Sequence, residues 1–394
     1  MKIADFTDSN INQQTTVATH VSILKSGLQK LGHEVMVVTC DLEVDTRYTQ
    51  GQTVFFPAKI SSNIYGQSAK AMKLFGLSHL VDAFAPDIVH IETYGKIGMA
   101  GLQYAKKRNL PLLATLHSLH DVISGYEVNP FFDKFIRYRN EYRLKRALNR
   151  CDIVTSASRK NAGIIKNLGL KFRVRIIPFC VDISMFKPLY SIDSGVGAMR
   201  QNLGIPDQNS VVIFSGRLNP DDNVDMLLED WSKAVTEDDQ LQLLIIGSGR
   251  EASALAEKAK LLGISSQVTF AGEMPRDELT MCFAMCKAFV SACTSATLKS
   301  SPLEAIACGV PAILKIDSAN ADIIINGVNG FTYSQPEELG EIIHKLAKID
   351  SDGEVLMKKL VSKTAANLTD LNQAQALLSC YALAKEKHEK QKSK

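Results

Sequence analysis

Short apolar runs alternate with amphipathic stretches from the first residue of this chain of 394 residues. Residues 1–8 and 35–39 have the apolar character of buried strands, and the segment between them repeats apolar positions every three or four residues. This repeat predicts a helix from about Val17 to Leu31, and Gly32 follows it as a stop signal. The chain therefore opens with a strand, a helix and a second strand.

The same alternation continues to the end of the chain. Further strands are predicted at 87–90, 112–117, 151–156, 211–214, 243–246, 289–290 and 312–314, with late helices at 337–348 and 366–388. Strands that alternate with helices form parallel sheets covered by helices on both faces. Because a chain of this length exceeds one ordinary core, we expect two α/β domains, each with a doubly wound parallel sheet.

Residues 289–311 (FVSACTSATLKSSPLEAIACGVP) contain the most informative strand–loop–helix step. A short helix is predicted to open near Pro302 and run through Glu304, and Gly309 follows its end. The loop and the first helical turn then lie at the carboxyl ends of the strands, where open α/β sheets bind ligands. Unpaired backbone N–H groups at such a place suit a phosphate.

Composition and charge narrow the class of protein. A content of 45% hydrophobic and 22% charged residues is typical of globular domains, and a net charge of +3 gives no reason to expect a nucleic-acid partner. No apolar run approaches the roughly 20 residues that cross a bilayer. Asp5 interrupts the apolar core that a signal peptide would need, so we expect a cytoplasmic protein.

The eight cysteines are scattered, mostly among apolar neighbours, which is typical of reduced thiols in cores. Cys282 and Cys286 are four positions apart and could share a metal ion. No second pair of ligands lies nearby in the sequence, so buried structural thiols are the favoured interpretation.

Three strings carry a resemblance to a known family: LGHEV at 31–35, SGRLNPDDNVD at 215–225, and Glu304 with AIACG at 305–309. They are similar to motifs of family 4 glycosyltransferases with the GT-B fold, and the resemblance covers nearly the whole chain. It implies two Rossmann-like domains that face a cleft, and a last helix that packs back on the first domain. The implied divisions are an acceptor-side domain at 1–182, a linker at 183–209, a nucleotide-sugar-side domain at 210–365, and a crossing helix with a charged tail at 366–394.

The resemblance also implies roles for particular residues. Arg217 would hold the donor diphosphate, Glu304 would orient the sugar and ribose, and His117 would face the sugar and the acceptor. His120, close behind His117, is an alternative for the last role. Donor-binding residues implied by position are Thr16, Gly216, Gly247, Met274 and Leu303. In the family the sugar is transferred with retention and without a metal, so no cofactor is expected beyond a nucleotide-sugar co-substrate such as a UDP-sugar.

Several positions depart from the family pattern. Ala296 stands where the family has the first of two glutamates, and Asp222 stands where it has a phosphate-binding lysine. A carboxylate at roughly 4–6 Å from a diphosphate would repel it by kcal/mol amounts. Thr16 replaces a glycine that gives the diphosphate room. Lys299 and Lys315 are nearby in the sequence and could supply the missing positive charge from another direction.

Residues 131–150 (FFDKFIRYRNEYRLKRALNR) form the most basic segment of the chain. A basic helix with interleaved aromatic residues can lie on an anionic membrane surface. The alternative is a solvated helix face whose aromatic side chains pack inward, and this is the interpretation that we favour from the sequence.

Two hypotheses of function follow. The first is a retaining hexosyltransferase with an altered donor site that acts on a lipid or a cell-surface glycan, in the cytoplasm or at the inner face of the membrane. The second is a non-catalytic GT-B homologue that supports an active partner glycosyltransferase. The departures at 222 and 296 argue for impaired transfer, whereas the overall resemblance argues for the enzyme.

Overall fold

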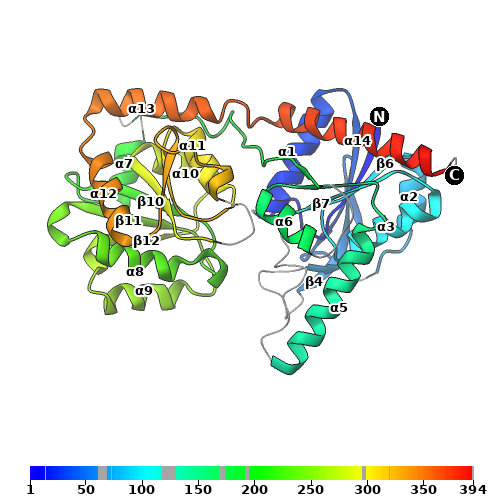
Figure 1. Ribbon diagram of the computed structural model, residues 1–394, viewed down its shortest axis with the longest axis horizontal. Helices are drawn as coiled ribbons and strands as arrows, with labels where there is room; N and C mark the ends of the chain where they lie inside the picture. The colour runs from blue at the N-terminus through cyan, green and yellow to red at the C-terminus, as the bar shows by residue number, and fades with distance from the viewer. Residues whose placement is uncertain are drawn as a thin grey trace. The chain divides into compact units, whose positions relative to one another are not determined.

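The computed structural model describes the chain except residues 14, 61–68, 72, 118–129, 168–173, 191–194, 295–298, 319 and 393–394. Within this description the chain divides into two compact units, shown in Figure 1 and described separately below. Unit 1 comprises residues 1–180, 296–298 and 370–394. Unit 2 comprises residues 181–295 and 299–369.

Unit 1 is built on a sheet with the strand order β3-β4-β2-β1-β6-β7-β8-β9, to which β5 is added beside β4. The strands from β4 to β9 along this path run parallel, while β3 and β5 pair with β4 in antiparallel fashion. The strands are β1 (Lys2–Phe6), β2 (Glu34–Asp41), β3 (Tyr48–Gln50), β4 (Thr53–Ile60), β5 (Ala69–Ala71), β6 (Ile88–Ile91), β7 (Leu112–Leu116), β8 (Ile153–Ser156) and β9 (Arg175–Ile176). The helices are α1 (Thr16–Lys30), α2 (Leu77–Phe84), α3 (Lys96–Arg108), α5 (Pro130–Leu148), α6 (Arg159–Asn167) and α14 (Asp370–Lys392).

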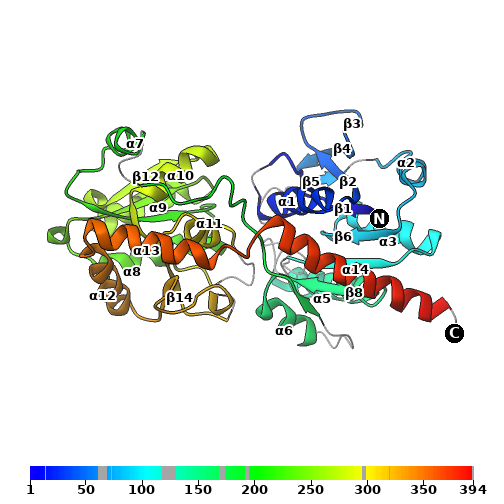
Figure 2. The same ribbon diagram turned by 90° about the horizontal axis from the view of Figure 1, so that it is seen from above.

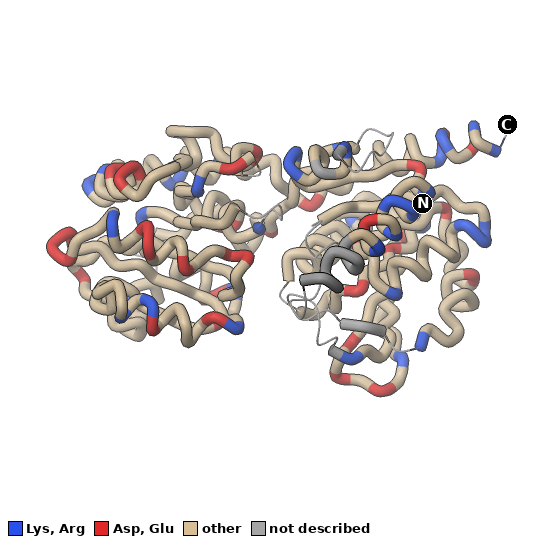
Figure 3. Tube along the Cα trace, turned by 60° about the horizontal axis from the view of Figure 1, so that its bottom comes forward, with Lys and Arg blue, Asp and Glu red and all other residues tan. Residues whose placement is uncertain are grey.

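The last helix, α14, packs against unit 1, as Figure 2 shows for its passage beside α1. A Cβ on Gly27 of α1 would lie only 2.4 Å from the carbonyl oxygen of Asp370, so the glycine allows the two helices to approach closely. Lys30 forms an ion pair of 2.6 Å with Asp370 at the same place. The final turns of α14 carry several lysines, visible next to the C-terminus in Figure 3.

Unit 2 is an entirely parallel sheet with the order β12-β11-β10-β13-β14-β15. The strand order reverses between β10 and β13, which makes this the topological switch point of a doubly wound sheet. Its strands are β10 (Ser210–Ser215), β11 (Leu241–Ile246), β12 (Val268–Gly272), β13 (Cys286–Ser291), β14 (Ala312–Lys315) and β15 (Gly330–Tyr333). Its α-helices are α7 (Val196–Asn202), α8 (Val224–Ala234), α9 (Ala252–Leu261), α10 (Arg276–Ala284), α11 (Ser301–Ala307), α12 (Pro336–Ala347) and α13 (Ser351–Thr364), with 3₁₀ turns η1 (Pro220–Asp222), η2 (Glu237–Asp239), η3 (Ser265–Gln267) and η4 (Asn320–Asp322).

These observations confirm the predicted fold class: two units with parallel sheets, and a C-terminal helix on the first. Helix α7 lies at 196–202, inside the segment that the sequence predicted as a linker. All eight cysteines are free and buried, as expected for reduced thiols. Burial raises the pKa of Cys282 to about 12 and that of Cys286 well above its usual value, so both remain protonated thiols at neutral pH. Across the described residues, every helix is too short or too polar to pass through a bilayer.

Candidate active site

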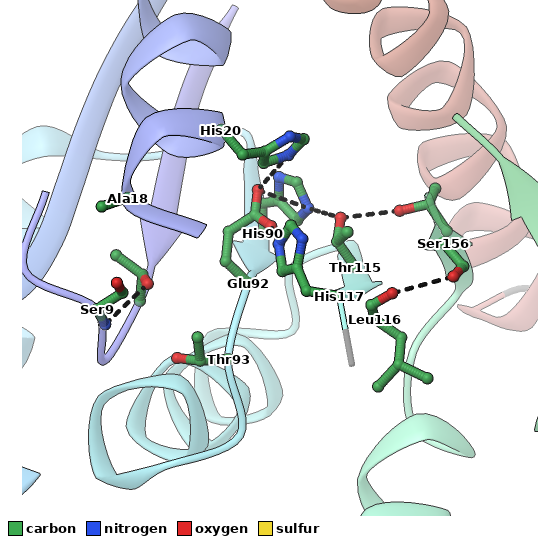
Figure 4. Close-up of polar contacts among 12 residues, drawn as sticks. Ser9, Ala18, His20, His90, Glu92, Thr93, Thr115, Leu116, His117 and Ser156 are labelled. Atoms are coloured by element: carbon green, nitrogen blue, oxygen red, sulfur yellow. Dashed lines mark hydrogen bonds and ion pairs between the residues drawn. The ribbon is translucent and has the colours of Figure 1, made fainter. Parts of the chain in front are cut away.

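A buried carboxylate surrounded by three histidines lies in unit 1, at the carboxyl ends of β6 and β7. We call His20, His90, Glu92 and His117 the His–Glu cluster; Figure 4 shows the three imidazoles turned toward Glu92. The Nε2 atom of His117 lies 2.5 Å from Oε2 of Glu92. The Nε2 atoms of His20 and His90 lie 3.6 and 3.5 Å from the other carboxylate oxygen, Oε1. All four side chains are buried, so their charges must be balanced inside the cluster.

Both ring nitrogens of His90 have hydrogen-bond partners. Its Nε2 lies 2.7 Å from the hydroxyl oxygen of Thr115, and its Nδ1 lies 2.9 Å from the hydroxyl oxygen of Tyr381 on α14. Burial lowers the pKa of His90 to about 4, so the ring is uncharged at neutral pH. A neutral ring can donate from Nε2 to Thr115 and accept from Tyr381 at Nδ1.

The pKa values of two buried carboxyl groups in this region shift in opposite directions. Burial alone would raise the pKa of Glu92, but interactions with His90, His20 and His117, including a hydrogen bond with His117, outweigh it and hold the pKa well below its usual value. Burial, and then the charge of Glu92, raises the pKa of Asp5 on β1. The surroundings therefore favour the ionised form of Glu92 and the neutral form of Asp5. His117 makes the shortest contact with the Glu92 carboxylate.

His20, Glu92 and His117 each offer a ligand atom within 4.8 Å of the others, as in a two-histidine, one-carboxylate metal site. The hydrogen bonds around His20 argue against that use. The amide nitrogen of Gln373 lies 2.9 Å from the carbonyl oxygen of Pro178 and 3.4 Å from Nδ1 of His20. A nitrogen that donates to Nδ1 leaves the ring proton on Nε2, where a metal would need a lone pair. The cluster fits a buried ion pair better than a metal site.

The structure places the two predicted site residues of unit 1 as follows. His117 directly follows β7, is 4% exposed, and stacks on Phe179 with ring centroids 5.6 Å apart. Thr16 is the half-buried first residue of α1, one turn before His20. His120 lies outside the described residues. The proposed roles of His117 and Thr16 stay predictions.

In unit 2, three loops at the carboxyl ends of adjacent strands touch through their backbones. The three segments are residues 215–219, which begin with the last residue of β10, residues 247–250 after β11, and residues 272–275, which begin with the last residue of β12. We call them the donor loops, after the role that the resemblance implies. A Cβ on Gly247, whose φ is +139°, would lie 1.8 Å from the carbonyl oxygen of Gly216. The amide of Gly247 donates to the carbonyl of Gly272 over 2.7 Å. Glycine at 247 is therefore required by both backbone conformation and space.

The remaining predicted donor residues differ in exposure. Arg217 is exposed and makes no hydrogen bond or ion pair with any residue that the structure describes, so its guanidinium is available to an anion. Met274 is half-buried, with its sulfur 3.6 Å from that of Cys282. Leu303 is 4% exposed, so any contact with a ligand would fall to its backbone.

Glu304 lies in α11 and is 5% exposed. Burial raises its pKa, while the positive charge of Arg276 acts in the opposite direction. Nη2 of Arg276 donates to Oε1 of Glu304 over 2.7 Å, and the guanidinium also covers the ring of Phe186 at 4.9 Å. This arrangement holds the Glu304 carboxyl group in one orientation.

The two lysines that could replace the missing phosphate-binding lysine are both ion-paired. Nζ of Lys299 lies 2.9 Å from Oδ1 of Asp222, and Nζ of Lys315 lies 2.7 Å from Oδ2 of Asp230. The expectation that Asp222 presents a bare negative charge to a diphosphate is therefore wrong, because Lys299 neutralises it. Ala296 lies outside the described residues.

The described part of the basic helix α5 contradicts the interpretation that its aromatic side chains pack inward. Tyr138 is 69% exposed and Tyr142 is 56% exposed. The face that packs inward is aliphatic and includes Leu144 and Leu148. Exposed basic residues accompany the tyrosines: Arg139, Arg143, Lys145, Arg146 and Arg150. Nothing is described of the side chains at 131–137.

Sequence reasoning missed His20, Glu92 and Arg276. A signal for Glu92 was present: His90 and Glu92 are two residues apart at a strand's carboxyl end, so both can face the same side. His20 and Arg276 come from helices and carry no comparable signal.

Comparison with known proteins identifies the class that this fold and these loops define. The model described as "Glycosyltransferase Family 4" matches residues 17–185, and the model described as "Glycosyl transferases group 1" matches residues 196–364. The two matches cover most of both units. The chain belongs to the family 4 glycosyltransferases and has the GT-B fold.

Similar relatives include enzymes named for a lipid product. The α-monoglucosyldiacylglycerol synthase of Streptococcus pneumoniae is 26% identical over 93% of this chain and 83% of its own length. The enzyme of the same name from Acholeplasma laidlawii is 24% identical over 90% of each chain. Among solved structures, Anabaena HepE in complex with UDP and glucose superposes with a TM-score of 0.73 at 18% identity, over 97% of this chain and 99% of that one. At this identity the structural likeness concerns the fold alone.

Proposed function

We propose that this protein transfers a hexosyl group from a nucleotide-sugar to a lipid acceptor, with retention at the anomeric carbon. On this proposal, unit 2 binds the donor. Arg217 binds the diphosphate, Glu304 accepts hydrogen bonds from hydroxyl groups of the ribose or sugar, and the region of Met274 contacts the base. The His–Glu cluster forms the acceptor side, with His117 facing the sugar and the acceptor.

The observation that carries the proposal is the arrangement of the donor loops beside Arg217. Gly216 and Gly247 leave the turn without side chains, and the neighbouring guanidinium of Arg217 is exposed and has no partner among the described residues. This arrangement suits a ligand with phosphate groups. The turns lie at the carboxyl ends of the strands, where open α/β sheets bind their ligands. Stabilisation of a leaving diphosphate by such fixed groups needs no protein nucleophile and no metal.

The lipid acceptor is supported by the relatives that are named for glucosyldiacylglycerol and by the exposed face of α5. Tyr138 and Tyr142 have rings suited to a membrane interface, and the adjacent arginines suit anionic head groups at about 1 kcal/mol each. We therefore propose peripheral binding to the inner face of the membrane through α5.

Calorimetric titration with UDP, GDP, ADP and their hexose conjugates tests the donor half of this proposal. We expect micromolar affinity for one nucleotide, and a loss of at least about tenfold in Glu304→Ala. If well-folded protein binds none of them, the proposal fails. That result would favour the alternative, a non-catalytic homologue that supports a partner glycosyltransferase.

A further inference from the structure

An ion pair joins two loops of unit 2 at the switch point of its sheet. Asp222 belongs to η1 in the loop after β10, and Lys299 belongs to the loop after β13. Asp222 is 3% exposed, and its second oxygen, Oδ2, is buried without a hydrogen-bond partner among the described residues. A charged group so deeply buried is costly unless its partner stays in place.

The two loops are also joined beside this ion pair. The thiol of Cys293, in the loop after β13, donates to the carbonyl oxygen of Asp221 over 3.1 Å. Asn320 donates to the carbonyl oxygen of Cys293 over 3.0 Å and so ties in the loop after β14. These contacts hold Lys299 at the carboxyl ends of β10 and β13.

The surroundings identify the chemical class of ligand. Strands β10 and β13 flank the point at which the strand order reverses, and ligands of open α/β sheets bind outside this point. Arg217, on the same loop as Asp222, is exposed and unpaired among the described residues. The Lys299 side chain is 19% exposed, so the ammonium group keeps access to solvent while it pairs with Asp222. A lysine and an arginine from adjacent loops suit an anion with two charged groups.

We propose that Lys299 binds the diphosphate of the nucleotide-sugar together with Arg217, and that Asp222 is the positioning residue that holds Lys299 there. Lys299 then supplies the positive charge that the family's lysine would supply from position 222, and donor binding is preserved. This inference rests on the proposed function, because it assumes that the ligand is a nucleoside diphosphate or its sugar conjugate.

The chain provides a closely matched control. The pair Lys315–Asp230 lies in the same unit, has a lysine side chain of the same 19% exposure, and also pairs with a buried aspartate. Its lysine ends β14 rather than the loop after β13. Lys315→Ala therefore reproduces the loss of a mostly buried ion pair without removing the proposed ligand contact.

The test measures the affinity of the full-length protein for whichever of UDP, GDP and ADP the wild type binds best, and for the corresponding nucleoside by competition. We expect Lys299→Ala to weaken diphosphate binding at least about tenfold, which corresponds to about 1.4 kcal/mol, with nucleoside affinity unchanged. Lys299→Arg should stay within about threefold of the wild type. The double variant Asp222→Asn, Lys299→Ala should recover part of the loss, because it removes the stranded carboxylate. Lys315→Ala should bind like the wild type.

Equal diphosphate affinity in Lys299→Ala and Lys315→Ala would overturn the assignment and leave the proposed function standing. Equal loss for nucleoside and diphosphate would show a structural role only, and would also overturn it. Wild-type protein that is folded by circular dichroism and binds no nucleoside diphosphate would overturn both the assignment and the function on which it rests.

Discussion

Replacement of Gly247 by alanine should separate the donor loops and abolish most of the transfer activity. The new Cβ would lie 1.8 Å from the carbonyl oxygen of Gly216, so the two loops would have to move apart by about 1 Å or more to reach the 3.0 Å that real contacts require. The φ of +139° at this position adds strain of about 1–3 kcal/mol for a residue with a Cβ. A displacement of about 1 Å in a site that works by positioning costs about 100-fold in rate.

Gly263→Ala is the matched control for this prediction. Gly263, in the same unit but outside the donor loops, also has positive φ, +72°, and nothing lies within 4 Å of the added Cβ. The variant should lose only about 1–2 kcal/mol of unfolding free energy through backbone strain, with little change in turnover. Urea unfolding and initial rates of hexose transfer measure the two effects separately. If Gly247→Ala and Gly263→Ala show the same nucleotide affinity and rate, our reasoning about the donor loops is refuted.

Three further predictions follow from the same structure. Arg217→Ala and Glu304→Ala should each reduce the initial rate of transfer by about 100-fold or more, because each removes a fixed group proposed to bind the donor. Burial lowers the pKa of His90 to about 4 in the folded protein, below the usual value of 6.5. As the pH falls, the unfolded chain therefore binds a proton at this histidine before the folded protein does. The stability that His90 contributes above pH 6.5 should be lost, by about 3 kcal/mol, as the pH falls to about 4. Arg143→Glu with Arg146→Glu on α5 should reduce the fraction of protein that sediments with anionic vesicles by about tenfold or more, since two attractive charges become repulsive.

Controls make these outcomes interpretable. The raised pKa of Asp5 stabilises the folded protein as the pH falls, whereas the lowered pKa of His90 destabilises it. The unfolding free energy should therefore be measured against pH in both the wild type and His90→Gln. Identical pH dependence in the two would contradict the assigned state of His90. For vesicle binding, Lys345→Glu with Lys348→Glu changes two exposed lysines at the end of α12 by the same amount of charge. An equal loss in both double variants would show general electrostatics and no special role for α5.

The sequence predicted the first strand, α1 and β2, because burial in these elements largely follows the apolar period. In α1 the periodic positions Val21, Leu24 and Leu28 are buried. Helix α13 was missed because its pattern is reversed. Val355, Leu356 and Leu360 are about half exposed or more, whereas Lys358 is 1% exposed and donates to the carbonyl oxygen of Ala284 over 2.6 Å. Because a lysine is buried and the apolar residues are exposed, the sequence of α13 shows no apolar period that would predict a helix.

Only the residues of the candidate site that lie in motifs or at strand ends were predicted from the sequence. His117, Arg217, Glu304 and the glycine turns were proposed because they match family motifs next to recognisable strands. The partners that determine their charges could not be predicted, because they are distant in the chain: Asp222 and Lys299 meet across 77 positions, which is visible only in the folded unit. The sequence alone therefore does not show that Asp222, which stands in place of a phosphate-binding lysine, is paired with Lys299.

The most direct test of the account is transfer of labelled hexose to lipid by the full-length protein. Anionic vesicles that contain diacylglycerol are incubated with UDP-glucose or with another nucleotide-sugar that titration has shown to bind, and label is measured in the extracted lipid. We predict label in the lipid with the donor that binds, and a loss of about 100-fold in Glu304→Ala. Nucleotide binding by folded protein without any label in lipid would contradict the proposed lipid acceptor, and a rate unchanged in Glu304→Ala would contradict the donor site described above.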